Sequence, residues 1–252
     1  MRLTWLGQAG FRIELDDVCV VLDPWTSPHE LRRVPTPHET VVADGVDWLL
    51  VTHEHIDHLD PPAVRLVVER SPDARIVLPT SIAPLVAELA PADRVVPVEP
   101  GDVLDLGSVE CRVVPAFHGV TMDDAYGDGS ALGAGPRFVG FVLGGRVYHA
   151  GDSIVTDALR EALEPLAFDV ALLPINGRDA EREARGIVGN MDAAEAVELA
   201  VDVGASTLVP YHWDGFQGNT VSPGAAVDLA DGRLHVVVPG RFRPIEIPAP
   251  GG

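Results

Sequence analysis

The sequence predicts an α/β protein built as a four-layer αββα sandwich, with two mixed β-sheets packed face to face and helices outside. Each half of the chain begins with strands that alternate apolar and polar residues, and ends with strands that alternate with helices. The chain has 252 residues, of which 46% are hydrophobic, which suffices for one large core. No linker divides it, so we expect a single domain over residues 1–252 with a frayed tail at 244–252.

The first half is expected to begin with a meander of three short strands, at residues 2–6, 11–15 and 18–22. Residues 26–45 are rich in proline and lack periodicity, which indicates a surface loop. It lies shortly before the histidine-rich segment at residues 52–60. The remaining elements are expected to be a helix over 62–70, a strand over 75–78, a helix over 81–90, a strand over 94–98, and a hairpin over 102–106 and 109–115.

The second half begins after a stretch rich in glycine and aspartate, residues 119–136, which indicates a second long loop. Whether either long loop acts as a lid stays open. The elements that follow are expected to be strands over 137–143 and 146–150, a helix over 154–163, a strand over 168–173, a helix over 192–203, a strand over 206–210, a helix over 223–230 and a strand over 233–238.

The composition excludes several classes of function. The net charge is −20 and all 18 basic residues are arginine, so no basic face for nucleic acid is expected. No apolar run reaches the roughly 20 residues that cross a bilayer, and the N-terminus lacks the apolar core of a signal peptide, so we expect a cytoplasmic protein without a membrane partner. Cys19 and Cys111 lie in apolar stretches and are interpreted as buried free thiols.

The most informative stretch runs from Thr52 to Asp60, directly after the apolar residues 48–51. Imidazole and carboxylate groups are ligands for zinc, manganese and iron. Side chains alternate along an extended backbone, so His53 and His55 point to the same side. Asp57 and His58 follow on a turn and can face a second position, so the stretch indicates ligands divided between two metals.

Three later strands end in a residue of the same kind: His118, Asp152 and His212. Any one alone would be weak evidence, and Asp152 is also well placed to cap the helix expected at 154–163. Loops at one end of the strands build the site in a layered fold. Together with the first stretch, the three positions therefore favour a shared metal centre.

The spacing His-x-His-x-Asp-His after a hydrophobic strand resembles the signature of the metallo-β-lactamase superfamily. The resemblance implies a metal-dependent hydrolase that uses a metal-bound hydroxide and two divalent ions, zinc or manganese. It implies that one metal is held by His53, His55 and His118, that the other is held by Asp57, His58 and His212, and that Asp152 bridges them. Asp57 is the candidate catalytic residue, because it can accept and return a proton during turnover.

Other polar residues are candidates for orienting these ligands. Asp23 either supports an imidazole or serves as a turn residue before Pro24, and both readings stay open. Asp60 and His149 are further candidates, although His149 fits equally well as a buried histidine with one partner. The remaining histidines lack supporting context and are interpreted as surface residues: His29, His38 and His235.

Residues 174–192 carry arginines and an asparagine between a buried strand and a helix, and guanidinium groups suit phosphate or carboxylate. With residues 4–11 and 211–216, this region is similar to the L-ascorbate 6-phosphate lactonase-like branch of the superfamily. That resemblance implies the opening of a lactone or similar ester in a small anionic substrate, such as a phosphorylated sugar acid. It implies that the substrate is contacted by Arg178, Arg182 and Asn190. Gln8 departs from the histidine of many relatives at this position.

Two alternatives remain open at this point. The first is a small-molecule phosphodiesterase on the same dinuclear site. The second belongs to another class and is a non-hydrolytic metal-binding or redox module. The oligomeric state also stays open, although sandwich folds of this kind often form homo-oligomers.

Overall fold

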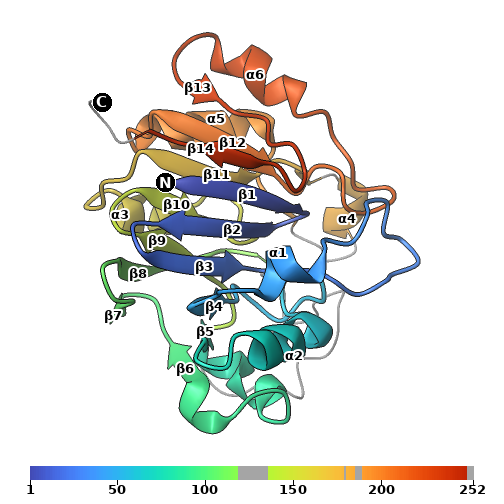
Figure 1. The fold of residues 1–252 in the computed structure, drawn as a ribbon. Helices are drawn as coiled ribbons and strands as arrows, with labels where there is room; N and C mark the ends of the chain where they lie inside the picture. Colours follow the sequence, from blue (N-terminus) through green and yellow to red (C-terminus); the bar gives the residue numbers. More distant parts are fainter. Residues whose placement is uncertain (119–135, 179, 185–188, 249–252) are drawn as a thin grey trace.

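The computed structural model describes residues 1–118, 136–178, 180–184 and 189–248, and the side chains of Arg182 and Glu183 lie outside this description. The expected loop at 119–136 therefore falls almost wholly outside the described residues, as does Arg185. In the described part of the chain, two seven-stranded mixed sheets pack against each other (Figure 1). The prediction of two mixed sheets with helices outside is confirmed.

The first sheet has the strand order β14-β1-β2-β3-β4-β5-β6. Its strands from β14 to β3 pair antiparallel, and those from β3 to β6 pair parallel. The bounds are β1 Arg2–Gly7, β2 Gly10–Leu15, β3 Val18–Leu22, β4 Trp48–Leu50, β5 Arg75–Pro79, β6 Val95–Val98 and β14 Pro244–Glu246.

The second sheet repeats this plan with the order β13-β12-β11-β10-β9-β8-β7. Its strands from β7 to β10 pair antiparallel, and those from β10 to β13 pair parallel. The bounds are β7 Val103–Asp105, β8 Glu110–Pro115, β9 Val139–Leu143, β10 Val147–His149, β11 Val170–Pro174, β12 Thr207–Tyr211 and β13 His235–Val236.

The hydrophobic residues form three layers, as a sandwich requires. The central cluster joins the inner faces of the two sheets and includes Trp5, Phe11 and Phe141. The helices α1 (Glu39–Ala43) and α2 (Pro61–Arg70) cover the first sheet. The second sheet is covered by α3 (Asp157–Leu163), α5 (Ala193–Asp202) and α6 (Gly224–Ala230) (Figure 1).

The structure differs from the predicted local elements in three places. The loop at 26–45 contains the short helix α1, capped by the side chain of His38, so His38 has a structural role. The segment expected as a helix at 81–90 contains a 3₁₀ helix over Thr80–Val86, because Pro84 removes a donor. The short helix α4 (Ala180–Ala184) lies in a segment for which no element was predicted. The helix α3 is capped by Thr156, so the alternative role of Asp152 as the cap of this helix is excluded.

The tail expected to fray from residue 244 instead contributes a strand. Residues 244–246 pair antiparallel with β1, and Arg2 Nε donates a hydrogen bond of 2.8 Å to Glu246 Oε1. Proline is tolerated here because β14 is an edge strand. This pairing covers the edge that β1 would otherwise expose to another chain.

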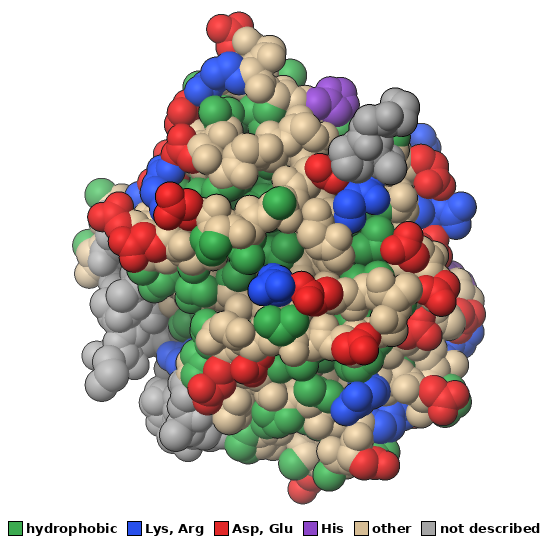
Figure 2. All heavy atoms as spheres, turned by 90° about the vertical axis from the view of Figure 1, so that its left-hand side faces the viewer, with side chains coloured by type: hydrophobic (Ala, Val, Ile, Leu, Met, Phe, Trp, Pro, Cys, Tyr) green, Lys and Arg blue, Asp and Glu red, His purple; other side chains and the backbone are tan. Residues whose placement is uncertain are grey.

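No helix in the described part of the chain is long and apolar enough to cross a membrane. Cys19 and Cys111 are both buried and free, as predicted. Figure 2 shows one face of the molecule, on which arginines are scattered singly among acidic side chains. The described residues on that face therefore form no continuous basic patch, in keeping with the net charge of −20.

Candidate metal centre

The candidate ligands lie where parallel and antiparallel strands of both sheets end at one edge of the sandwich. The loop after β4 carries His53, His55, Asp57 and His58. The second sheet supplies the other three after β8, β10 and β12, as His118, Asp152 and His212. All seven side chains are buried. The fold therefore brings together residues that are separated by up to 159 positions in the sequence.

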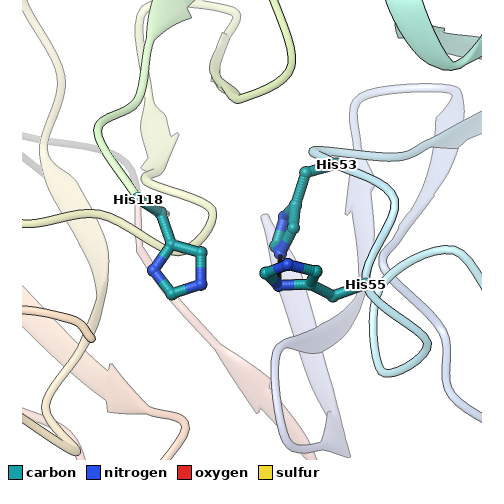
Figure 3. A group of neighbouring side chains, drawn as sticks. All are labelled: His53, His55 and His118. Atoms are coloured by element: carbon teal, nitrogen blue, oxygen red, sulfur yellow. Dashed lines mark hydrogen bonds between the residues drawn. The ribbon is translucent and has the colours of Figure 1, made fainter. Parts of the chain in front are cut away.

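The seven residues form three overlapping groups whose candidate ligand atoms lie within 4.8 Å of one another. These groups are His53, His55 and His118; His53, His58 and Asp152; and Asp57, His58 and His212. Figure 3 shows the first group, in which His118 faces the pair formed by His53 and His55 from the opposite side. Their roles as metal ligands stay predictions.

The ring nitrogens that face away from the centre are held by hydrogen bonds. His118 Nδ1–H donates to the Gly189 carbonyl at 2.7 Å, and His58 Nδ1–H donates to Asp23 Oδ2 at 2.7 Å. His53 Nδ1 lies 3.0 Å from the Thr52 hydroxyl, which itself donates to Asp23. Such contacts fix the tautomer and direct the opposite nitrogen inward, which is typical of metal-binding histidines.

Asp23 has the supporting role that the sequence left open. Its Oδ1 accepts the Thr52 backbone N–H at 2.8 Å, and its Oδ2 accepts from both the Thr52 hydroxyl and His58. The side chain is fully buried, so these contacts exclude water. Asp23 therefore links the end of β3 to the loop that carries four of the candidate ligands.

The other two candidates for supporting roles do not contact the centre. Asp60 accepts hydrogen bonds from the backbone and hydroxyl groups of Thr26 and Ser27, and so anchors the loop after β3. His149 donates from Nε2 to the Ala9 carbonyl at 2.9 Å and accepts at Nδ1 from the Gly151 backbone N–H at 3.1 Å. His149 is thus a buried structural histidine.

Gln8 is a site residue whose position the sequence could not predict. Its Nε2 lies 2.8 Å from Asp57 Oδ2 and 2.8 Å from His212 Nε2. Its Oε1 is buried without a hydrogen-bond partner among the described residues. A Cβ at Gly215 would lie 1.6 Å from this oxygen, so the glycine makes room for the amide.

The electrostatics of the site divide the histidines into two classes. Burial, together with the charges of neighbouring histidines, lowers the pKa of His53 well below its usual range, and burial also lowers that of His118. Burial alone would lower the pKa of His58 as well, but the carboxylates of Asp152, Asp57 and Asp23 outweigh it and raise the pKa well above its usual range. The same balance, led by Asp152, raises the pKa of His212 to about 9.

The two carboxylates show the complementary shift. Burial alone would raise the pKa of Asp57 and Asp152, but the neighbouring His58 and His212 outweigh it, so both pKa values fall below the usual range. His212 Nε2 lies 3.2 Å from Asp152 Oδ2 and 3.3 Å from Asp57 Oδ2. Without a cation, the protonated imidazoles therefore balance the two buried carboxylates.

These residues fit a bound divalent cation. His58 Nε2 and Asp152 Oδ1 are both buried without a hydrogen-bond partner among the described residues, although they lie 3.4 Å apart. Buried polar atoms in this state carry a large desolvation cost unless a ligand or ion satisfies them. Imidazole nitrogens and carboxylate oxygens are the donors that zinc and manganese accept.

Metal binding is expected to release protons. A metal requires neutral imidazoles, whereas the raised pKa values leave His58 and His212 protonated near neutral pH when no metal is bound. Affinity should therefore rise with pH, by up to about a hundredfold per pH unit while both groups release a proton. Calorimetry with Zn²⁺ in buffers of different ionisation enthalpy measures this release. Binding that is independent of pH, without released protons, would contradict it.

A cavity of about 470 Å³ opens above this centre. Its floor contains five of the candidate ligands: His55, Asp57, His118, Asp152 and His212. Asn190, predicted to contact substrate, also lines it. His29 was expected to be a surface residue, but it lines the cavity and packs against Trp25 and Phe216.

The arginines predicted to contact substrate are not among the described lining residues. Arg178 forms a two-pronged ion pair with Glu195, through hydrogen bonds of 2.5 and 3.0 Å. Glu195 also closes the capping box that begins α5, so Arg178 supports the helix end. Arg182 lies in α4, but its side chain is outside the description.

The comparisons with known proteins decide the family. The family model described as the beta-lactamase superfamily domain matches residues 19–213. A UPF0173 metal-dependent hydrolase of Methanopyrus kandleri is 34% identical over 222 residues, which cover 86% of this chain and 85% of the relative. The chain belongs to the beta-lactamase superfamily, within its UPF0173 metal-dependent hydrolases. The predicted superfamily is thereby confirmed, and the protein is a metal-dependent hydrolase of this fold.

Solved structures share the fold of this superfamily member. Igni18, a metallo hydrolase from the archaeon Ignicoccus hospitalis, aligns with a TM-score of 0.69 and 22% identity, over 98% of this chain and 99% of its own. CmlA, a diiron beta-hydroxylase from Streptomyces venezuelae, aligns with a TM-score of 0.71 and 16% identity, over 98% of this chain and 54% of its own. At these identities the likeness shows the fold alone.

Proposed function

We propose that this hydrolase opens a lactone or similar ester bond in a small molecule. The observation that carries the proposal is the position of the candidate metal ligands, which form the floor of the cavity. A small ester bound there has its carbonyl within reach of the buried ligand set. When bound, divalent ions supply Lewis acidity to the carbonyl and lower the pKa of a water to about 7.

The residues of the chain supply binding, orientation and proton transfer. Asp57 lines the cavity, and its carboxylate is held by Gln8 Nε2 at 2.8 Å. Its low pKa keeps it ionised near neutral pH, so it can accept a proton from the attacking water and return it to the leaving oxygen. Asp152 lies between the two groups of histidines, which supports the proposal that it bridges two ions.

An ester is favoured over the phosphodiester alternative by the charge of the cavity. Among the described residues that line it, the side chains with a formal charge at neutral pH include Glu30, Asp57 and Asp152, and no arginine. A phosphodiester keeps its negative charge throughout the reaction, and apart from the proposed metal ions the described lining offers no arginine to stabilise that charge. A lactone is neutral until attack, so its binding does not depend on a cationic side chain.

The likeness to the L-ascorbate 6-phosphate lactonase-like branch stays a prediction. The relatives are named for metal-dependent hydrolysis rather than for a substrate. Zinc and manganese both remain candidates, because imidazole and carboxylate ligands accept either ion. The single-domain organisation, the cytoplasmic location and the homo-oligomer also stay predictions.

Turnover by metal-replete protein tests the proposal. The panel contains δ-valerolactone, phenyl acetate, bis-p-nitrophenyl phosphate and a cephalosporin, with zinc and manganese supplied separately. We expect hydrolysis of the lactone and the carboxylic ester, lost on chelation and restored by metal. Hydrolysis of the phosphodiester or the cephalosporin alone would contradict the proposed substrate class. Metal-dependent oxidation chemistry without any hydrolysis would favour the redox alternative.

A further inference from the structure

The carboxamide side chains of this protein are confined to one place. The chain contains only three asparagines and two glutamines. Four of the five line the cavity above the metal centre, and the fifth, Gln8, contacts Asp57 and His212 beneath it. Only sixteen of the described residues line this cavity, so chance placement does not explain the gathering. The four that line the cavity are Asn176, Asn190, Gln217 and Asn219.

The three asparagines are joined by hydrogen bonds across distant segments. Asn190 Nδ2 donates to Asn176 Oδ1 at 2.9 Å, and Asn176 Nδ2 donates to Asn219 Oδ1 at 3.2 Å. Each amide fixes the orientation of the next through these two hydrogen bonds. The series therefore ends at Asn190 Oδ1, on the side of the metal centre. This oxygen is buried and has no hydrogen-bond partner among the described residues, while Asn190 itself is 0% exposed.

The backbone holds the inner end of this chain beside the metal centre. Asn190 N–H donates to the Gly177 carbonyl at 3.2 Å, and Gly177 N–H donates to the Met191 carbonyl at 3.1 Å. The carbonyl of Gly189, the residue before Asn190, accepts the hydrogen bond from His118 Nδ1. A group that contacts Asn190 is therefore close to the ester bond that the site would cleave.

Away from the candidate metal ligands and the carboxamides, the other described side chains of the cavity wall are apolar except for Glu30 and His29. Phe216 stacks on Trp25 with ring centroids 4.9 Å apart, and Leu31 and Ile56 also line the cavity, each 43% exposed. The nearby Arg32 donates to backbone carbonyls, including those of Trp25 and Val34, and its guanidinium lies over the Trp25 ring. The described wall thus offers neutral hydrogen-bonding groups facing a hydrophobic surface.

We propose that the cavity binds an uncharged, hydroxyl-bearing lactone, whose hydroxyls bond to the carboxamides and whose apolar face packs on Phe216 and Ile56. The inference rests on the proposed lactonase function and names its substrate class. A carboxamide both donates and accepts, which matches a hydroxyl. An unpaired buried acceptor such as Asn190 Oδ1 favours a ligand that donates to it over an analogue that cannot.

A phosphorylated ligand fits this wall less well. Apart from the proposed metal ions, the described lining offers a phosphate group no arginine, and neutral amides restore only part of the hydration that a buried phosphate loses. The net charge of −20 also opposes the approach of an anion. The carboxamides therefore take the role that the sequence assigned to arginines.

Three lactones of one ring size test the inference: D-glucono-1,5-lactone, its 6-phosphate and δ-valerolactone. We expect kcat/KM for the neutral sugar lactone to exceed that for each of the others by about tenfold or more, after subtraction of the spontaneous rate. Preference for the phosphate, or equal rates for δ-valerolactone and the sugar lactone, would overturn the inference while leaving the lactonase function intact.

Binding of non-hydrolysable D-glucono-1,5-lactam keeps the test independent of turnover. Calorimetry should show that the lactam binds about tenfold more tightly than its 6-phosphate. If no lactone is hydrolysed but the lactam binds with this preference, the proposed function fails, while the carboxamide subsite for an uncharged, hydroxyl-bearing ring is supported. Absence of lactam binding, or tighter binding of the phosphate, would overturn the inference.

Substitution of single carboxamide residues tests whether these side chains cause the preference for the sugar lactone. Asn190→Leu keeps the branched shape and the number of heavy atoms of the side chain but removes its hydrogen bonds. It should lower kcat/KM for the sugar lactone by about tenfold and for δ-valerolactone by less than about twofold. Asn219→Ala, at the half-buried outer end, serves the same purpose if Asn190→Leu does not fold. Asp228→Asn on the exposed face of α6 is the control. Equal losses for both lactones would overturn the subsite.

Discussion

Asp152→Ala should abolish hydrolysis and lower the metal content of the purified protein. Asp152 lies 3.2 Å from His212 and 3.4 Å from His58, and it belongs with His53 to one of the three groups of candidate ligands. Loss of the one carboxylate placed between the two sets should release at least one ion. A fall in kcat/KM of about a thousandfold or more is expected, which corresponds to about 4 kcal/mol of lost transition-state stabilisation.

Metal analysis and lactone turnover measure these effects together. Circular dichroism should show that the fold is retained, since the substitution leaves the three hydrophobic layers untouched. Asp157→Ala is the matched control, because Asp157 is an exposed residue in the first turn of α3. If Asp152→Ala retained two ions and full activity, the assignment of a bridging carboxylate would be wrong.

Gly151→Ala is expected to disrupt the same carboxylate through the backbone. Gly151 has φ +61°, and a Cβ there would lie 2.8 Å from the Val139 carbonyl oxygen and 2.9 Å from Thr52 Cβ. The left-handed backbone and the two close contacts together should cost about 2–4 kcal/mol in the free energy of unfolding. Relief of the contacts would move Asp152 away from His58, so metal affinity should fall as well.

Substitution of a second glycine distinguishes the strain of the left-handed backbone from the effect of the close contacts at Gly151. Gly204 has φ +73° but no atom within 4 Å of its Cβ position, so Gly204→Ala should cost only about 1 kcal/mol of strain and leave metal affinity unchanged. Denaturant unfolding of the metal-free proteins and calorimetry with Zn²⁺ measure the two quantities. Equal effects of the two substitutions on both quantities would show that the close approach of Gly151 to Thr52 does not position Asp152.

The architecture and the gathering of the candidate ligands were predictable because their signals are local. His53 and His55 alternate along an extended segment, and His118, Asp152 and His212 each follow an apolar strand. Strands of a layered fold end at a common edge, so residues at several strand ends come together without knowledge of their contacts. The capping box of Asp192 and Glu195 likewise depends on residues only three positions apart.

The remaining features depend on contacts between distant segments. The pairing of β14 with β1 joins the two ends of the chain, and the composition of the tail gave no sign of it. Asn176 and Asn219 meet across 43 positions, and Gln8 reaches His212 across 204. Composition did contain one usable signal, since the scarcity of carboxamides in the sequence marks the few that are present.

Arg178 shows why residue type alone does not identify a substrate contact. Arg178 is close in sequence to Asn176 and Asn190, and its guanidinium suits an anion. In the fold, however, Glu195 lies at 2.5 Å from it, because both residues belong to the segments that meet at the start of α5. The Glu195 carboxylate thus binds the guanidinium group that was predicted to bind the substrate.

The central claim is that the buried histidines and aspartates bind two metal ions that are required for ester hydrolysis. Titration of metal-stripped protein with Zn²⁺ or Mn²⁺ tests it most directly, with bound ions counted by native mass spectrometry and δ-valerolactone turnover followed in the same samples. The account predicts saturation at two ions per chain, with activity that appears on metal addition and is absent from Asp152→Ala. Saturation at a single ion, or turnover that is independent of metal, would contradict it.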